Sequence, residues 1–149
     1  MKFFTLKAEQ WIPRTPEELF PFFGDAQNLE TLTPPWLHFG IDTSPNEMQA
    51  GARIDYHLRV HGIPIQWQSE ISVWEPPFRF VDIQTHGPYR AWIHEHTFEP
   101  RNGGTLMRDH VQYAVLGGTL VRKLLVAPDL EEIFKYRRAR LGSIFGGAH

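Results

Sequence analysis

The stretch Trp92-Ile93-His94-Glu95-His96-Thr97-Phe98 runs through the turn Arg101-Asn102-Gly103-Gly104 into a second alternating stretch, residues 105–115. Side chains alternate faces along a strand. One face of the first stretch therefore carries Trp92, His94, His96 and Phe98. One face of the second carries Met107, Asp109, Val111 and Tyr113. The glycine turn predicts an antiparallel hairpin, with imidazoles, a carboxylate and a phenol among apolar side chains.

The same period of two continues upstream. It predicts strands over residues 37–43, 52–61, 64–75, 78–86 and 89–99, and the segments between them contain Gly, Pro and Asn. Such short connections favour an antiparallel meander. The expected inward side chains of the second and third strands are Ile54, Tyr56, Leu58, Val60, Ile65, Trp67, Ile71 and Val73. The pattern leaves open which face of 78–86 points inward: Phe80 with Asp82, or Val81 with Ile83.

The two ends of the chain complete the predicted fold. Residues 2–12 alternate as a half-buried strand, and Thr15, Pro16 and Glu18 form a capping box that begins a helix ending at Gly24. A second short helix should follow Asp25 and end before Pro34-Pro35. After Gly117 the apolar spacing becomes three and four residues up to Phe145, with a kink or a restart at Pro128.

This order predicts an α+β fold of the helix-grip type. A curved antiparallel sheet of about six to seven strands would wrap around a long C-terminal helix, with two short helices after the first strand. The last helix is the long amphipathic element available to cover the concave face of the sheet. Such an arrangement commonly leaves a cavity between the sheet and the helix.

Composition limits the functional classes. The chain has 149 residues, 42% apolar and 21% charged, which suits one domain over residues 1–149. The formal net charge is -2, so we expect no nucleic-acid partner. No apolar run approaches the ~18 residues of a membrane span, and the apolar N-terminal stretch is too short for a signal peptide. The absence of cysteine fits a cytoplasmic location, which we expect for this protein. We also expect a monomer or a weak homodimer.

Several segments of the sequence carry a family resemblance. Residues 16–29 resemble the opening helices of the START-like, helix-grip superfamily (SRPBCC), in which a Phe pair precedes an Asp and a Leu. A bacterial polyketide cyclase/dehydrase-like or coenzyme-Q-binding-like subgroup is resembled by residues 28–36, Gly87-Pro88-Tyr89, the stretch from Trp92 through His94-Glu95-His96 to Phe98, the pair Asp109 and Tyr113, and Phe134-Lys135-Tyr136-Arg137. The resemblance covers the whole chain. It implies a hydrophobic cavity and carries over no catalytic residue.

The cluster of His94, His96, Asp109 and Tyr113 admits three interpretations. Two histidines and a carboxylate can form a metal site with open positions. A histidine tuned by Asp109, with Tyr113 as a donor to a carbonyl oxygen, can perform acid–base chemistry. The same groups can also be hydrogen-bonded polar residues in the wall of a pocket. The sequence favours the third interpretation, so we expect neither a metal nor a cofactor.

We therefore expect a cavity that binds a hydrophobic or aromatic small molecule, such as a lipid, a quinone or a polyketide-like compound. The alternative is a metal-independent cyclase or dehydratase that uses the His/Asp/Tyr set. Arg137 falls on the apolar stripe of the last helix, where it can cap the pocket or pair with Asp109. The candidate ligand-binding residues are Tyr56, Trp67, Trp92, His94, His96, Phe98, Met107, Asp109, Tyr113, Phe134 and Arg137.

Overall fold

The computed structural model describes residues 1–146, except for the side chains of Leu120 and Leu124, two leucines of the C-terminal helical pattern. Seven strands form one antiparallel sheet in the order β1-β7-β6-β5-β4-β3-β2. The strands are β1 (Phe4–Ile12), β2 (Gly40–Thr43), β3 (Arg53–Val60), β4 (Ile63–Glu75), β5 (Arg79–His86), β6 (Ala91–Arg101) and β7 (Gly104–Ala114). From β2 to β7 each strand pairs with the next, which confirms the predicted meander. β1 closes the edge beside β7.

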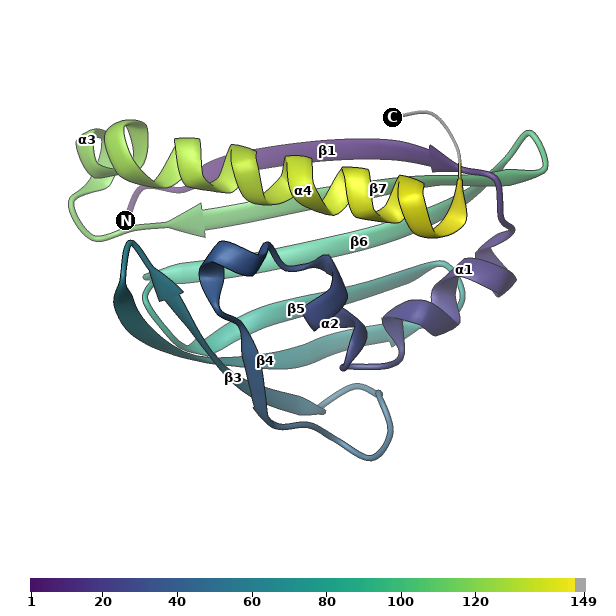
Figure 1. Ribbon diagram of the computed structural model, residues 1–149, viewed down its shortest axis with the longest axis horizontal. Coiled ribbons are helices and arrows are strands. Elements are labelled where there is room, and N and C mark those ends of the chain that lie inside the picture. Colours follow the sequence, from purple (N-terminus) through teal and green to yellow (C-terminus); the bar gives the residue numbers. More distant parts are fainter. Residues whose placement is uncertain (147–149) are drawn as a thin grey trace.

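The helices lie on one side of this sheet (Figure 1). They are α1 (Pro16–Phe23), α2 (Asn28–Leu32), the 3-10 turn η1 (Pro35–Leu37), α3 (Gly118–Val121), the π-helical stretch η2 (Arg122–Val126) and α4 (Ala127–Phe145). α4 runs along β1 and β7, and α1 packs near β6 (Figure 1). This is the predicted helix-grip arrangement.

Local signals in the sequence fix where the helices begin. The Thr15 hydroxyl accepts a hydrogen bond from the Glu18 N–H, and the Glu18 carboxylate accepts one from the Thr15 N–H, so the predicted capping box is present. Pro128 lies in the first turn of α4, directly after the π-helical stretch. The predicted interruption at Pro128 is therefore a change of helical form followed by a restart of the α-helix.

Two apolar clusters lie between the sheet and the helices. The first surrounds α1 and includes Phe20, Phe80 and Phe98. The second lies under the start of α4 and includes Trp92 and Leu130. Trp92 and Phe98 are six residues apart on β6, and both point inward. His94 and His96 lie between them on the same strand, so the buried polar group separates the two clusters.

One prediction of which side chains point inward is wrong. Val73 was expected inward, but the register of β4 against β5 shifts between Ile71 and Val73. The bulge inserts one residue and reverses the alternation. As a result Trp74 points inward and packs on Phe20 and Phe80. The sequence left open which face of β5 points inward, and in the structure it is the face that carries Phe80 and Asp82.

Among the described residues, no helix is long and apolar enough to cross a membrane.

Candidate ligand cavity and its polar end

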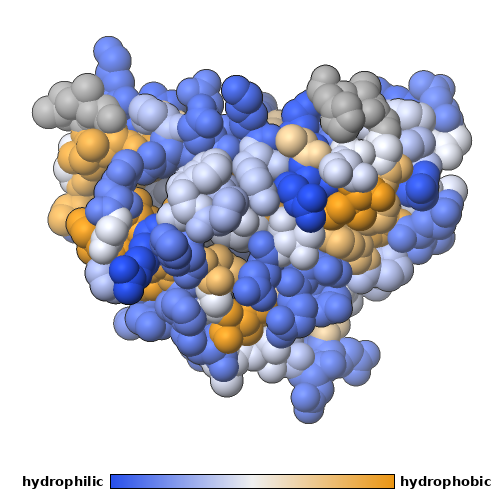
Figure 2. Space-filling view, in the orientation of Figure 1, coloured by the Kyte–Doolittle hydropathy of each residue, from blue (hydrophilic) through white to orange (hydrophobic). Residues whose placement is uncertain are grey.

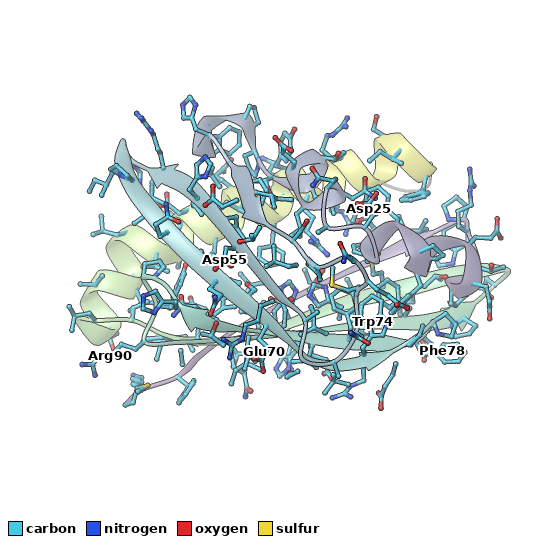
Figure 3. All side chains as sticks on the ribbon, turned by 90° about the horizontal axis from the view of Figure 1, so that it is seen from below. Asp25, Asp55, Glu70, Trp74, Phe78 and Arg90 are labelled. Carbon is cyan, nitrogen blue, oxygen red and sulfur yellow. The ribbon has the colours of Figure 1, made fainter. Side chains whose placement is uncertain are left out.

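A cavity of about 820 Å³ lies between the sheet, α4 and the α2–η1 segment. Its volume is in the range of ordinary ligand sites. β3 and β4 contribute Ile54, Tyr56, Leu58, Val60, Ile65 and Trp67, as predicted, and α4 contributes Leu130, Ile133 and Phe134. Figure 3 shows the sheet on one side and the helices on the other, with Trp74 and Phe78 labelled at the end of the sheet nearest α1.

The wall of the cavity contains a connected set of aromatic rings. Tyr56 stacks on Trp67 with ring centroids 5.9 Å apart, and Trp67 meets Trp92 edge-on at 5.6 Å. Tyr89 contacts both tryptophans. Such rings offer flat, rigid and apolar surface to a ligand.

Apolar side chains also reach the surface near the cavity. Figure 2 shows apolar residues gathered at the α3 end of the molecule. Leu116, which precedes α3 and lines the cavity, is 71% exposed. His61 in the β3–β4 turn and Asp129 of α4 also line the cavity, and they pair at 2.9 Å. This pair joins the sheet to the helix over the cavity.

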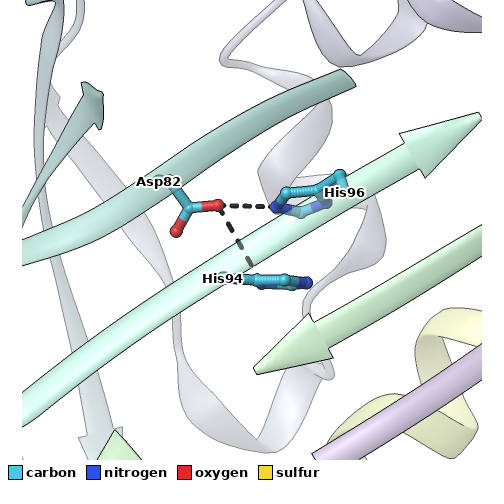
Figure 4. A group of neighbouring side chains, drawn as sticks. All are labelled: Asp82, His94 and His96. Atoms are coloured by element: carbon cyan, nitrogen blue, oxygen red, sulfur yellow. Dashed lines mark hydrogen bonds and ion pairs between the residues drawn. The ribbon is translucent and has the colours of Figure 1, made fainter. Parts of the chain in front are cut away.

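The polar end of the cavity is a group of two carboxylates and two imidazoles. Asp82 on β5 lies opposite His94 on β6 in the strand register, and His96 follows two residues later on the same face. The Nε2 atom of His96 lies 2.6 Å from Oδ2 of Asp82 (Figure 4). The Nδ1 atom of His94 lies 3.9 Å from the same oxygen. With 20% of its side chain exposed, Asp82 is the most accessible of these three residues.

Asp109 on β7 lies on the other side of the two histidines. Its Oδ1 atom lies 2.7 Å from Nε2 of His94 and 3.4 Å from Nδ1 of His96. Arg137 of α4 reaches the same oxygen at 3.5 Å. The pairing of Arg137 with Asp109 that the sequence raised as one of two roles is therefore present. Each imidazole thus lies between two carboxylates, with one short contact and one long contact.

The two imidazoles also stack. Their ring centroids are 3.6 Å apart at an interplanar angle of 22°, and Phe80 covers the outer face of His96 at 3.9 Å. The three rings form a column in which each imidazole packs against a neighbouring ring. Packing and hydrogen bonding therefore hold the same two side chains.

Burial and neighbouring charges shift the pKa values of this group. Burial lowers the pKa of His96 to about 4, and His94 adds to that effect, so His96 is neutral near pH 7. Burial raises the pKa of Asp109, but the Arg137 charge and the His94 hydrogen bond lower it more, so the pKa lies well below its usual range. The pKa of Asp82 is also lowered: burial is the largest single effect and raises it, but the His96 hydrogen bond and the electrostatic interactions with His94, His96 and Arg137 together outweigh burial. Both carboxylates are therefore ionised and accept from the imidazole N–H groups.

Except for Tyr113, the candidate residues from the sequence fall into three places. Tyr56, Trp67, Trp92, His94, His96, Phe134 and Arg137 line the cavity. Phe98 and Met107 belong to the apolar cluster around α1 instead. Asp109 lies behind the histidines, beside a smaller cavity of about 230 Å³ between α4 and the β1–β7 edge.

Tyr113 is not brought to the histidines. It is 1% exposed and is absent from the cavity wall. Its hydroxyl accepts a hydrogen bond from Nε of Arg122 at 3.3 Å. The inward face of β7 extends beyond the cavity, so sharing that face with Asp109 was not sufficient to place Tyr113 beside the imidazoles.

Sequence reasoning gave no definite role to three residues of the site. Asp82 depended on the undecided face of its strand, Ser69 sits mid-strand among polar neighbours, and Tyr89 lies in a turn. Ser69 accepts from Nε1 of Trp67 at 3.0 Å and lies 3.3 Å from the Tyr56 hydroxyl. The antiparallel pairing of 78–86 with 89–99 contained the signal for Asp82, because it places Asp82 directly opposite His94.

Asp82, His94 and His96 also have the composition of a metal site. Each offers one ligand atom, and the three atoms lie within 4.8 Å of one another. Two imidazoles and one carboxylate, with open space on the cavity side, match the donor set of several transition-metal sites.

Comparisons with known proteins agree with the fold. No curated protein matches the sequence significantly. Protein CV1439 from Chromobacterium violaceum superposes with a TM-score of 0.76 at 13% identity, covering 97% of this chain and 99% of that one. TTHA0849 from Thermus thermophilus gives 0.67 at 22% identity, covering 94% and 98%. A START superfamily protein from Mycobacterium smegmatis gives 0.68 at 13% identity, covering 95% and 98%.

These likenesses concern the fold alone. The sequence itself matches one family model, described as polyketide cyclase/dehydrase and lipid transport, over residues 4–143. That match covers nearly the whole chain, including every residue of the cavity and its polar end. The chain therefore belongs to the polyketide cyclase/dehydrase and lipid transport family.

Proposed function

We propose that the protein binds a hydrophobic, aromatic small molecule in the cavity between the sheet and α4. The observation that carries this proposal is the cavity of about 820 Å³, whose wall is mostly apolar and includes stacked aromatic rings. A pocket of this kind excludes water and gains free energy from each apolar group that it covers. Lipids, quinones and polycyclic polyketide-like compounds have the matching chemistry.

The polar end gives such a ligand an orientation. The carboxylate of Asp82 accepts hydrogen bonds, and Arg137 is a donor that also lines the cavity. A ligand with one polar edge and an apolar body would direct that edge toward Asp82 and its body toward Tyr56 and Trp67. Buried polar groups raise specificity in this way, because a ligand lacking the matching group leaves them unpaired.

Ligand screening tests the proposal. Purified protein is incubated with lipids, quinones and polyphenolic ketides and analysed by native mass spectrometry and thermal shift. Binding should also change tryptophan fluorescence, because Trp67 and Trp92 line the cavity. A one-to-one complex that raises the melting temperature is the expected result. If no compound of these classes binds at concentrations up to solubility, the proposal fails.

One observation favours an enzymatic role in the same cavity. His96 is a neutral imidazole held between two ionised carboxylates at the cavity wall. In a cyclisation, such a base removes a proton from the carbon beside one carbonyl. That carbon then bonds to a second carbonyl carbon, whose oxygen takes up the proton and becomes a hydroxyl. Removal of a second proton from the attacking carbon, with protonation of the departing hydroxyl, then releases water and forms a carbon–carbon double bond. Tyr113 lies away from the cavity, so the proton donor would be the imidazolium formed in the first step, and Arg137 would stabilise the developing oxyanion by donating a hydrogen bond.

The enzymatic alternative has its own assay. A linear polyketone is incubated with the protein, and the product is analysed for the loss of one water molecule. Turnover should fall strongly in His96→Gln while the ligand still binds. Equal product formation in the wild type, in His96→Gln and in buffer would leave binding as the function.

A further inference from the structure

We propose that Asp82, His94 and His96 bind a divalent first-row transition-metal ion at the polar end of the cavity. Their ligand atoms lie within 4.8 Å of one another and come from adjacent strands in direct register (Figure 4). Both strands are in the middle of the sheet, which holds the three side chains on a rigid support. The sequence led us to expect no metal, and the metal site that was weighed there had Asp109 as its carboxylate. In the structure the carboxylate grouped with the two histidines is that of Asp82.

An unpartnered nitrogen supports this assignment. Nδ1 of His96 is buried and has no hydrogen-bond partner among the described residues. It lies 3.4 Å from Oδ1 of Asp109, and both atoms are acceptors while the His96 proton resides on Nε2. If Nε2 coordinates a cation instead of donating to Asp82, the proton moves to Nδ1 and can be donated to Asp109. The metal-bound form therefore satisfies an atom that the metal-free form leaves unpaired.

Asp109 then has the position of an outer carboxylate for both histidines. Its Oδ1 atom already accepts from Nε2 of His94 at 2.7 Å, which leaves Nδ1 of His94 free on the side of Asp82. Metal-binding histidines usually donate their second ring N–H to a carboxylate, which fixes the tautomer and orients the ring. Arg137 in turn holds Asp109 at 3.5 Å.

Charge and donor type define the class of ion. Two carboxylates share this buried region with one guanidinium, so a cation would compensate a surplus of negative charge. Mg²⁺ and Ca²⁺ prefer sites built from six or more oxygens, whereas two imidazoles with one carboxylate suit Zn²⁺, Fe²⁺ or Co²⁺. The remaining coordination positions would face the cavity, where water or a polar ligand atom can enter.

Coordination also requires a change in the imidazole column. The lone pair of a ring nitrogen lies in the ring plane, and the two rings are now stacked at 3.6 Å. Both nitrogens can point at one ion only after the rings tilt away from this parallel arrangement. Metal binding should therefore alter the NMR signals of both imidazoles, while the exposed His57, which pairs with Asp42, should be unaffected.

Titration with Co²⁺ tests the proposal without any organic ligand. Protein treated with a chelator and desalted is titrated with Co²⁺ and then with Zn²⁺, followed by calorimetry and by visible absorption of the cobalt complex. We expect one equivalent to bind, with a rise in the melting temperature. Asp82→Asn should weaken binding at least about tenfold, and Asp109→Asn should weaken it about 10–100-fold through the loss of the outer carboxylate.

His57→Gln is the matched control, because it removes an exposed histidine that pairs with a carboxylate at 2.8 Å. It should leave the affinity and the stoichiometry unchanged. Thermal unfolding without metal shows whether each variant is folded. A wild type that binds less than one equivalent, or binding that is equally strong in folded Asp82→Asn and in wild type, would overturn the proposal. Neither result affects the test of organic ligand binding.

Discussion

His94 and His96 stack face to face with ring centroids 3.6 Å apart, and each lies between Asp82 and Asp109. Two imidazolium ions in this column would repel each other strongly, and His96 is a neutral imidazole near pH 7. The burial that lowers the pKa of His96 and the carboxylates that surround it act in opposite directions, and burial is the larger effect.

The first prediction concerns stability and pH. The pKa of His96 falls from an unfolded value of 6.5 to about 4 in the folded protein. Between these values the unfolded chain binds more protons, so stability should be complete above pH 6.5 and decrease as the pH falls toward 4. The loss is on the order of 3 kcal/mol. Urea unfolding measured from pH 8 to pH 4 should show this slope.

His96→Gln should flatten the slope between pH 6.5 and pH 4, whereas His57→Gln should retain it. Below pH 4 a second loss is expected in all three proteins. The folded pKa values of Asp82 and Asp109 are lowered, so their contribution is present above the unfolded carboxyl pKa and is lost as the pH falls below it. A wild-type stability that is constant from pH 7 to pH 4 would contradict the neutral, buried state of His96.

The second prediction concerns Asp109. Asp109→Ala removes the acceptor of His94 and leaves the Arg137 guanidinium, 12% exposed, without its carboxylate. Breaking a buried ion pair by removing one partner costs about 3–5 kcal/mol. Chemical unfolding should show a loss of this size. Asp42→Ala removes an exposed partner of His57 and should change stability by less than about 1 kcal/mol. Similar losses of unfolding free energy in the two variants would mean that Asp109 contributes no more to stability than an exposed carboxylate does.

The sequence was sufficient for the fold because each local signal agreed with the next. The capping box at Thr15, the alternation along 92–98 and the restart at Pro128 each follow from short-range geometry, and the structure has all three. Val73 was misassigned because a bulge depends on pairing with β5, which the alternation of β4 alone does not reveal.

The candidate site was only partly predictable, for a different reason. Asp82 lay on a strand with apolar residues on both faces, so the inward face could not be chosen from periodicity. Tyr113 was assigned to the correct face of β7, but the position of α4 along the sheet decides which inward residues meet the cavity. That position depends on packing between distant segments, and strand periodicity carries no information about it.

The third prediction separates two tyrosines. Tyr113→Phe removes a hydroxyl that contacts Arg122 outside the cavity, so ligand affinity should not change and stability should fall by about 1 kcal/mol or less. Tyr56→Phe removes a hydroxyl from the cavity wall beside Ser69. It should weaken a ligand whose body carries a further polar group beside Tyr56 by about fivefold. Fluorescence titration of both variants with the same ligand makes the comparison, and an effect confined to Tyr113→Phe would place the ligand elsewhere.

The fourth prediction tests the cavity by filling it. Leu58 and Ile65 are cross-strand partners on β3 and β4, and both line the cavity. Replacing both with Trp adds two indole rings to the hairpin end of the space, so a ligand that occupies this end should lose at least about tenfold in affinity. Ile93→Trp is the control, because Ile93 lies on the opposite face of β6 from His94 and is 37% exposed.

The melting temperature distinguishes a variant whose cavity is blocked from a variant that is unfolded. The double variant replaces half-buried side chains beside open space, so the new rings have room and the melting temperature should remain near that of the wild type. Ligand affinity should then fall in the double variant and remain unchanged in Ile93→Trp. If the double variant is folded and binds as tightly as the wild type, the ligand does not use the hairpin end. Binding would then have to be confined to the region between Trp92, Phe134 and the polar end.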